Sequence, residues 1–299
     1  MTALHGYLAP EGFTEPLAEE LGDAVVRRHG RLLLASPRDP APAWAQNVWR
    51  DPRELPIASI KDASRQLRAI QRNWVLLSEA EHRRAALIDD QLPHVSAKPI
   101  APYSELPTAP LGSWTLLDRD TVLCATDCAS PFPHGEVRFV EDKHGPPSRA
   151  YLKLWELFTL EGVRPGPGDR VLDLGSAPGG WTWVLASLGC DVISVDKAPL
   201  DPKVAALPNV TFLEQSAFAL DPAEVGPVDW LLSDVICYPE RLWRLVERWR
   251  GAAARFACTL KFQGATDHAT AARFAAVEGS RLRHLSCNRH ELTWSLLGR

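Results

Sequence analysis

The sequence predicts an α/β fold in which a doubly wound sheet follows a smaller α+β domain. From residue 148 onward, apolar runs of strand length alternate with stretches of helix length. One of these runs, 171–174, leads directly into the glycine-rich turn Gly175-Ser-Ala-Pro-Gly-Gly180. A second run, 191–195, ends at Asp196, about 20 residues after Gly175, which is the spacing of a carboxylate that holds a ribose.

The first 92 residues have the pattern of a small α+β unit. We expect strands at 3–8, 31–35 and 74–77, and helices at 15–21, 60–70 and 79–89. This order suits a ferredoxin-like layer. Residues 93–112 follow, with prolines at 93, 99, 102, 107 and 110, and this density indicates a linker without regular structure.

Residues 113–299 are expected to form the second domain. It would begin with strands at 113–117 and 121–125 and a long ordered loop at 129–147. The later helices are expected at 149–160, 181–188, 239–250 and 266–278, and the strands at 170–174, 191–195, 210–213, 229–233, 255–260 and 291–296. In such a sheet, the ligand site lies at the carboxyl ends of the strands.

Composition narrows the class of protein. A length of 299 residues favours two domains, and 45% hydrophobic residues suffice for two cores. No apolar run approaches the roughly 20 residues that span a bilayer, and the first residues lack a basic region followed by an apolar one. The six cysteines include no Cys-x-x-Cys pair. We therefore expect a cytoplasmic protein with reduced thiols, no metal and no membrane contact.

The glycine turn has neither the Gly-x-Gly-x-x-Gly spacing of dinucleotide sites nor the Gly-Lys-Ser/Thr end of a P-loop. The box Asp173-Leu-Gly-Ser-Ala-Pro-Gly-Gly-Trp181 instead resembles the S-adenosylmethionine loop of the FtsJ/RrmJ-like ribose 2′-O-methyltransferases. Further pieces match that family in the same order: Ser148-Arg-Ala-Tyr-Leu-Lys-Leu-Trp-Glu156, Leu231-Leu-Ser-Asp-Val235, Thr259-Leu-Lys-Phe262 and Arg289-His-Glu-Leu-Thr293. The segment Ser130-Pro-Phe-Pro-His-Gly135 looks like the RlmM-type 23S rRNA cytidine 2′-O-methyltransferases.

The resemblance implies a Rossmann-like methyltransferase domain that binds S-adenosyl-L-methionine. The implied cofactor-binding residues are Gly175, Ser176, Ala177, Pro178, Gly179, Gly180, Trp181, Asp196, Ser216 and Asp234. Two of these positions stay open. Trp181 also fits an anchor of its helix in the core, and Ser216 stands where the family usually has an aspartate that contacts the adenine amino group.

The resemblance also implies a catalytic set made of Lys153, Asp234, Lys261 and Glu291. Methyl transfer to a ribose hydroxyl needs alignment of the hydroxyl and removal of its proton, and a lysine of lowered pKa can act as the base. Lys261 follows an apolar strand, so it would point into the cleft at the carboxyl edge of the sheet and act as that base. Lys153 would supply a second cation, Asp234 would orient a lysine, and Glu291 would complete the set. Taken singly, Lys153 and Glu291 also fit ordinary solvated positions.

The expected partner is RNA, with large-subunit rRNA as the substrate. The net charge of −4 speaks against a protein that coats polyanions generally, so binding would need a local basic surface. Candidate groups are Arg241, Arg244 and Arg248, then Arg281, Arg283 and Arg289, and finally Arg138, Lys143 and Arg149. Each group also fits a solvated face.

The N-terminal unit would help to hold RNA, although it is short for the RlmM type. Two alternatives remain. One is a binding protein that keeps the cofactor fold without catalysis, and the other is a methyltransferase for a different RNA or a small molecule.

Overall fold

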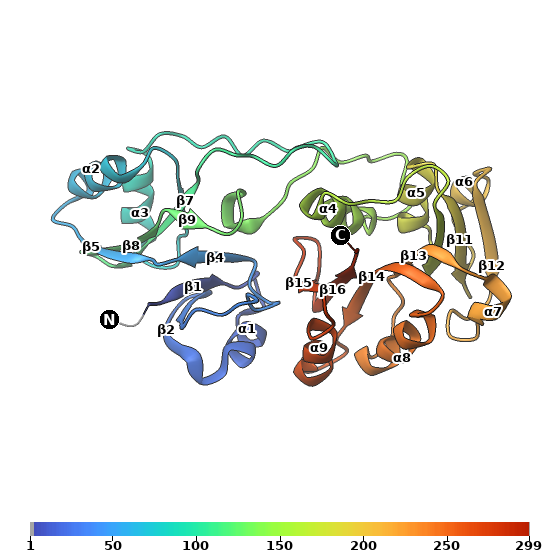
Figure 1. Ribbon diagram of the computed structural model, residues 1–299. Coiled ribbons are helices and arrows are strands. Elements are labelled where there is room, and N and C mark those ends of the chain that lie inside the picture. Colours follow the sequence, from blue (N-terminus) through green and yellow to red (C-terminus); the bar gives the residue numbers. More distant parts are fainter. Residues whose placement is uncertain (1–2, 299) are drawn as a thin grey trace. The chain divides into compact units, whose positions relative to one another are not determined.

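The computed structural model describes residues 3–298, which fall into two compact units (Figure 1). The N-terminal unit comprises residues 3–100 and 105–138, and the C-terminal unit comprises residues 101–104 and 139–298. Within this described part, no helix is both long and apolar enough to cross a bilayer. The same residues contain no group of three or more His, Cys, Asp or Glu side chains arranged to hold a metal ion.

A five-stranded antiparallel sheet forms one half of the N-terminal unit, in the order β2-β3-β1-β4-β9. Its elements are β1 (His5–Leu8), α1 (Thr14–Leu21), the 3₁₀ turn η1 (Gly22–Ala24), β2 (Val25–His29), β3 (Leu32–Ala35), β4 (Asn47–Arg50) and β9 (Asp127–Cys128). Leu8, Leu32 and Trp49 come from three different strands and pack in one buried cluster. Burial of these large apolar side chains is what holds the short strands together.

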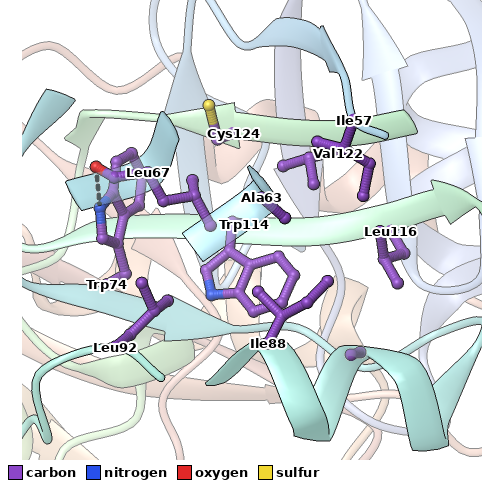
Figure 2. Close-up of a cluster of buried hydrophobic side chains, with 11 residues drawn as sticks. Ile57, Ala63, Leu67, Trp74, Ile88, Leu92, Trp114, Leu116, Val122 and Cys124 are labelled. Atoms are coloured by element: carbon purple, nitrogen blue, oxygen red, sulfur yellow. Dashed lines mark hydrogen bonds between the residues drawn. The ribbon is translucent and has the colours of Figure 1, made fainter. Parts of the chain in front are cut away.

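A four-stranded sheet forms the other half, in the order β5-β8-β7-β6. Its elements are β5 (Arg53–Pro56), α2 (Ile60–Ile70), β6 (Trp74–Leu76), α3 (His82–Asp89), β7 (Gly112–Asp118) and β8 (Thr121–Ala125). Leu67 of α2, Ile88 of α3 and Trp114 of β7 meet in its core with no exposed surface (Figure 2). The indole N–H of Trp74 donates to the carbonyl of Leu67 at 2.9 Å, which fastens β6 to the end of α2.

The structure corrects the predicted domain boundary at residue 113 and the single ferredoxin-like layer over 1–92. β7 and β8 belong to the N-terminal unit, because β8 pairs with β5 and β7 pairs in parallel with β6. The predicted strands at 113–117 and 121–125 are therefore present but complete an earlier sheet. Their partners lie tens of residues away, and a local hydrophobic pattern does not reveal which strands pair.

The proline-rich segment has no helix or extended strand over the described residues 93–111, as its composition predicts. It is more than a linker, however. Ile100 donates its N–H to the carbonyl of Arg138 at 2.8 Å within the N-terminal unit. Residues 101–104 belong to the C-terminal unit, where the N–H of Tyr103 donates to Thr159 Oγ1 at 2.9 Å.

The C-terminal unit contains a seven-stranded sheet with the order β12-β11-β10-β13-β14-β16-β15. Its strands are β10 (Arg170–Leu174), β11 (Asp191–Asp196), β12 (Val210–Glu214), β13 (Val228–Ser233), β14 (Ala253–Lys261), β15 (Arg281–Arg283) and β16 (Glu291–Leu296). The first five strands in this order run parallel, and β16 runs antiparallel to both β14 and β15. The predicted doubly wound fold is thereby confirmed.

Helices cover both faces of this sheet. They are α4 (Tyr151–Glu161), α5 (Gly180–Ser187), α6 (Pro202–Ala205), α7 (Pro222–Val225), α8 (Pro239–Trp249) and α9 (His268–Ala275). Figure 1 shows α4 and α5 above the sheet and α8 and α9 below it. The strand order reverses between β10 and β13, so their carboxyl ends border the crevice where ligands bind in folds of this kind. Ser233 Oγ donates to the Leu174 carbonyl at 3.1 Å and joins the two strand ends there.

We predict that Leu67→Ala lowers the free energy of unfolding of the N-terminal unit by about 2–5 kcal/mol, because it leaves a cavity in a filled core. Leu87→Ala on α3 is the matched control. Leu87 is 45% exposed, so its truncation should cost less than about 1 kcal/mol. Urea unfolding followed by circular dichroism, with hydrogen exchange of the α2 amides, measures both. Equal losses for the two variants would contradict the placement of Leu67.

Candidate active site

The turn after β10 is shaped by Gly175, which the surrounding chain requires. Gly175 has a φ of +78°, and a Cβ there would lie 2.5 Å from the Cα of Val235, so backbone occupies the space of a side chain. Gly180 begins α5 and lies close to Ser148, whose rotatable Oγ would be 2.5 Å from a Cβ at this position. The turn is therefore fixed between the residue after Asp234 and the segment that leads into α4.

Asp196 lies where the sequence placed it, at the end of β11 beside this turn. Its Oδ2 accepts from the N–H of Ala177 at 3.0 Å, and its Oδ1 accepts from the N–H of Ala198 at 3.0 Å. The carboxylate thus fastens the glycine-rich turn to the neighbouring strand. Its position fits the ribose role expected from the spacing, and that role stays a prediction.

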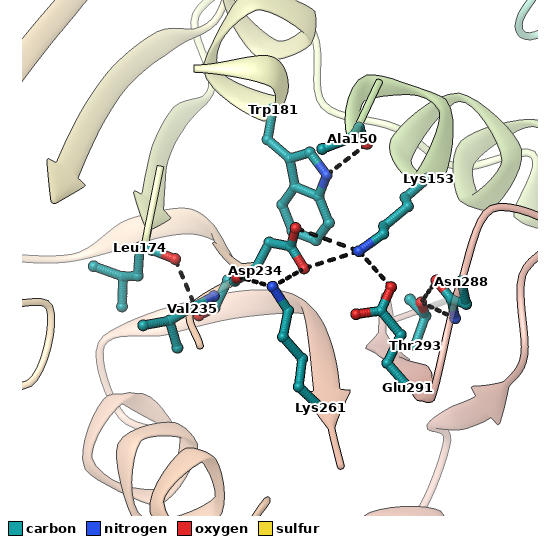
Figure 3. A network of polar contacts seen from close by, with 11 residues as sticks. Ala150, Lys153, Leu174, Trp181, Asp234, Val235, Lys261, Asn288, Glu291 and Thr293 are labelled. Atoms are coloured by element: carbon teal, nitrogen blue, oxygen red, sulfur yellow. Dashed lines mark hydrogen bonds and ion pairs between the residues drawn. The ribbon is translucent and has the colours of Figure 1, made fainter. Parts of the chain in front are cut away.

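Trp181 and Ser216, the two residues whose roles in cofactor binding the sequence leaves undecided, differ in their surroundings. Trp181 is only 3% exposed, and its indole N–H donates to the carbonyl of Ala150 at 2.9 Å (Figure 3). This contact supports the interpretation of Trp181 as an anchor between α5 and the start of α4. Ser216 is half-buried just after β12, where its Oγ accepts from the N–H of Phe218 at 3.3 Å.

Asp173 is a functional candidate that the sequence reasoning missed. It is fully buried at the carboxyl end of β10, and its Oδ2 accepts from Thr182 Oγ1 at 2.7 Å. The pKa of Asp173 is raised to about 7, chiefly by burial. The hydrogen bond from Thr182 acts to lower this pKa, and the charges of Asp234 and Asp196 act to raise it. Its Oδ1 has no hydrogen-bond partner among residues 3–298, nor has Ser176 Oγ in the turn. The available signal was an acid inside an apolar strand next to a glycine turn.

The four residues of the expected catalytic set lie together, although they come from four different elements (Figure 3). Lys153 is on α4, Asp234 follows β13, Lys261 ends β14 and Glu291 begins β16. Lys261 and Glu291 are direct partners in the antiparallel pairing of β14 and β16. The side chains are between 10% and 18% exposed, so these charges are largely shielded from water.

Lys153 lies between two carboxylates. Its Nζ is 3.1 Å from Asp234 Oδ1 and 2.6 Å from Glu291 Oε1. Burial is the strongest single influence and acts to lower the pKa of Lys153, but the two carboxylates together outweigh it and raise that pKa above its usual value. Lys153 is therefore held as a cation.

Lys261 has both of its contacts with a single residue, Asp234. Its Nζ donates to the main-chain carbonyl of Asp234 at 2.5 Å and lies 3.0 Å from Asp234 Oδ1. A tetrahedral amine nitrogen has three positions besides its carbon bond. The contacts with Asp234 occupy two of them, which leaves one position for a substrate atom.

Glu156 is the second residue to which the sequence reasoning assigned no role, although it ends the motif Ser148-Arg-Ala-Tyr-Leu-Lys-Leu-Trp-Glu156. It is 2% exposed, one turn after Lys153 on α4. Its carboxylate accepts from the N–H and the Oγ of Ser286, both at 2.9 Å. Burial raises the pKa of Glu156 to about 7, although these bonds oppose the shift. Glu156 ties α4, which carries Lys153, to the segment that leads into Glu291.

Several of the basic residues considered as an RNA surface are engaged within the chain. On α8, the guanidinium carbon of Arg241 lies 3.7 Å from the centre of the Phe218 ring, and Arg248 donates to the Phe218 carbonyl at 2.8 Å. Arg281 and Arg283 both pair with Glu161, at 3.1 Å and 2.6 Å. These contacts favour a structural role for those arginines.

Comparison with known proteins points to the same family as the motifs. Residues 146–249 match the family model of the FtsJ-like methyltransferases. The "Ribosomal RNA large subunit methyltransferase M" of Halorhodospira halophila is 42% identical over 106 residues, which is 34% of this chain and 31% of that protein. The protein of the same name from Xanthomonas campestris pv. campestris is 34% identical over 199 residues, or 63% of this chain and 52% of that protein. The resemblance seen in the motifs is thereby confirmed.

The chain spans about a third to a half of the length of these curated relatives. Among solved structures, it is similar to the fibrillarin pre-rRNA processing protein of Methanococcus jannaschii, with 15% identity and a TM-score of 0.36. That match covers 44% of this chain and 68% of the other.

Asp173 should make stability depend on pH. Its pKa is about 7 in the folded chain against an ordinary value of 3.8, so between these values only the unfolded chain releases the proton and stability falls as pH rises. Relative to Asp173→Asn, the native sequence should lose roughly 3 kcal/mol of unfolding free energy from pH 4 to pH 7.

Denaturant unfolding at a series of pH values measures this difference. Asp191→Asn is the control, because Asp191 is exposed at the start of β11, and its pH dependence should follow the native sequence. If Asp173→Asn also follows the native sequence, Asp173 does not titrate as its burial implies.

Proposed function

Because residues 146–249 form an FtsJ-like methyltransferase domain, we propose that this chain methylates the 2′-hydroxyl of a ribose in RNA, with S-adenosyl-L-methionine as the methyl donor. The observation that carries this proposal is the cluster of Lys153, Asp234, Lys261 and Glu291 at the carboxyl edge of the sheet. It places a shielded amine with one open position next to the glycine-rich turn, since Val235 packs against Gly175.

The residues around the turn fit the cofactor. Asp173 Oδ1 and Ser176 Oγ are buried polar atoms without a partner among the described residues, and they suit the polar groups of a bound amino acid portion. Asp196 is placed to accept from ribose hydroxyls, and Ser216 offers a neutral hydroxyl near the end of β12. When bound, S-adenosyl-L-methionine supplies a methyl group carried on a sulfonium.

Lys261 is the proposed general base. In its neutral form, Nζ donates two hydrogen bonds to Asp234 and keeps a lone pair at the third position. That lone pair would accept the proton of the ribose hydroxyl. The cofactor, when bound, would supply the methyl group to the hydroxyl oxygen and keep the electron pair of the broken sulfur–carbon bond as a neutral thioether. The proton ends on Nζ, where the adjacent Asp234 carboxylate stabilises the resulting cation.

Lys153 and Glu291 have supporting roles in this proposal. Lys153 stays protonated between its two carboxylates, so it is unsuited to act as the base. Its fixed charge stabilises the negative charge that develops on the attacking oxygen. Glu291 holds Lys153 in place at 2.6 Å and balances its charge.

Large-subunit rRNA is the proposed substrate, supported by the names of the relatives. We further propose that the N-terminal unit helps to hold the RNA and that the protein acts in the cytoplasm. Because the chain covers only part of the relatives' length, the substrate is tested directly.

The test is methyl transfer from labelled S-adenosyl-L-methionine to total RNA from a strain that lacks this gene. Wild type should place label in alkali-resistant dinucleotides, which mark 2′-O-methylation. Lys261→Ala should lower kcat by about 10²- to 10⁴-fold, while calorimetry shows cofactor binding within about twofold of wild type. Lys261→Arg should be similarly impaired, because arginine stays protonated and cannot accept the proton.

Glu278→Ala is the control, since it removes an exposed charge after α9 in the C-terminal unit, and it should match wild type. Transfer at the wild-type rate by Lys261→Ala would remove Lys261 from the role of base. Activity in Lys261→Arg but not in Lys261→Ala would mean that Lys261 acts only as a cation. Cofactor binding without label in any RNA, including ribosomal particles, would support the alternative of a catalytically inactive binding protein.

A further inference from the structure

The segment that follows Asp234 exposes two large side chains next to the catalytic set. Ile236 is 77% exposed and Tyr238 is 63% exposed, whereas the intervening Cys237 is 6% exposed and Pro239 is buried. Among residues 3–298, the other exposed large apolar side chains are isolated from one another in the sequence, at Val26, Leu87 and Val140. Ile236 and Tyr238 therefore form a local apolar surface, which we call the 236/238 shelf.

This shelf stands on a fixed backbone. The carbonyl of Asp234 accepts from Lys261 Nζ at 2.5 Å, and Val235 lies against Gly175 of the glycine-rich turn. Beyond the shelf, Tyr238 has an extended conformation (φ −68°, ψ 147°) and directly precedes α8, which begins at Pro239. Contacts of the half-buried Asp234 and Val235 on one side and the buried Pro239 on the other thus hold the segment, and the side chains of Ile236 and Tyr238 stay exposed between them.

We propose that Ile236 and Tyr238 stack against the base of the nucleotide whose ribose is methylated. This inference rests on the proposed function and names the part of the substrate that the site recognises. Ile236 and Tyr238 lie two and four residues after Asp234, which contacts the proposed base Lys261. Successive residues of an extended chain are about 3.3 Å apart, so the shelf begins within the length of one nucleoside from the reacting atoms.

The chemistry of the shelf favours a nucleobase. An aromatic ring and a branched aliphatic side chain offer flat and apolar contact but no charge, and every base has a π-face that stacks on such a surface. A base that stacks here cannot remain in a helical stack at the same time. The shelf therefore selects an unpaired nucleotide, in a loop or a single strand, whatever its sequence neighbours are.

Methyl transfer by Tyr238→Ala tests the shelf. The KM for RNA should rise roughly 5- to 150-fold, the effect of removing one base-stacking partner, while the affinity for S-adenosyl-L-methionine stays unchanged. Tyr238→Phe keeps the ring and should remain within about twofold of wild type. Ile236→Ala should raise the KM for RNA in the same direction by a smaller factor. Thr211→Ala removes an exposed side chain near the amino end of β12, in the C-terminal unit, and serves as the control.

An RNA that lacks only the base at the methylated nucleotide makes the test specific. With wild type, it should bind at least as weakly as the intact RNA binds to Tyr238→Ala, because the missing base would also contact Ile236. On this RNA, Tyr238→Ala should cost nothing further, because its contact with the base is already lost. Additive losses, or an unchanged KM for Tyr238→Ala, would overturn the proposal.

Failure of the proposed function would be distinguishable from failure of the shelf. If wild type methylates no RNA, binding of a short labelled single-stranded RNA is measured by fluorescence anisotropy for the same variants. Weaker binding by Tyr238→Ala than by Tyr238→Phe would keep the shelf as a base-binding surface. Equal binding by all variants would overturn it as well.

Discussion

The pairing of four largely shielded ionisable side chains is the constraint on which the candidate active site depends. Two lysines, Lys153 and Lys261, are matched by two carboxylates, Asp234 and Glu291. A single charge removed from water costs several kcal/mol, which an excellent arrangement of partners offsets only in part. Each member thus requires the others, and the removal of one leaves an unbalanced charge in a shielded site. Such a cluster is poor as a device for stability and well suited to fixing charged groups for a reaction.

The topology of the sheet brings these charges together. The strand order reverses between β10 and β13, which opens the crevice beside Asp234. β16 enters antiparallel beside β14, so the first residue of β16, Glu291, meets the last residue of β14, Lys261. Lys153 arrives from a helix instead, and Glu156 on the same helix is bonded to Ser286 ahead of β16. That second connection fixes the position of α4 relative to the strand that carries Glu291.

The sequence was informative wherever a signal is local. The helix at 60–70 and the strands at 170–174 and 121–125 lie where the apolar pattern predicts them, because burial of one face imposes that pattern directly. The four residues of the proposed catalytic set were selected through motifs, and the structure brings them together.

The features that the sequence did not predict depend on contacts that no local pattern encodes. Strands β7 and β8 were assigned to the wrong domain, because their partners β6 and β5 lie in a different part of the sequence. The short strands β2, β4 and β5 also went unrecognised, since few of their residues alternate between core and solvent. Asp173 and Glu156 were missed for another reason. Their importance comes from burial, and a sequence does not show that an acid inside an apolar run is enclosed on every side.

The two lysines differ in a way that follows from geometry alone. Lys153 is bonded to carboxylates from two directions, and each of them favours its charged form. Lys261 shares one of those carboxylates with Lys153, and its other partner is a neutral carbonyl. Less negative charge therefore surrounds Lys261 than surrounds Lys153. The same carbonyl belongs to the backbone that continues into Ile236 and Tyr238, so one residue, Asp234, fixes both the amine of Lys261 and the surface beside it.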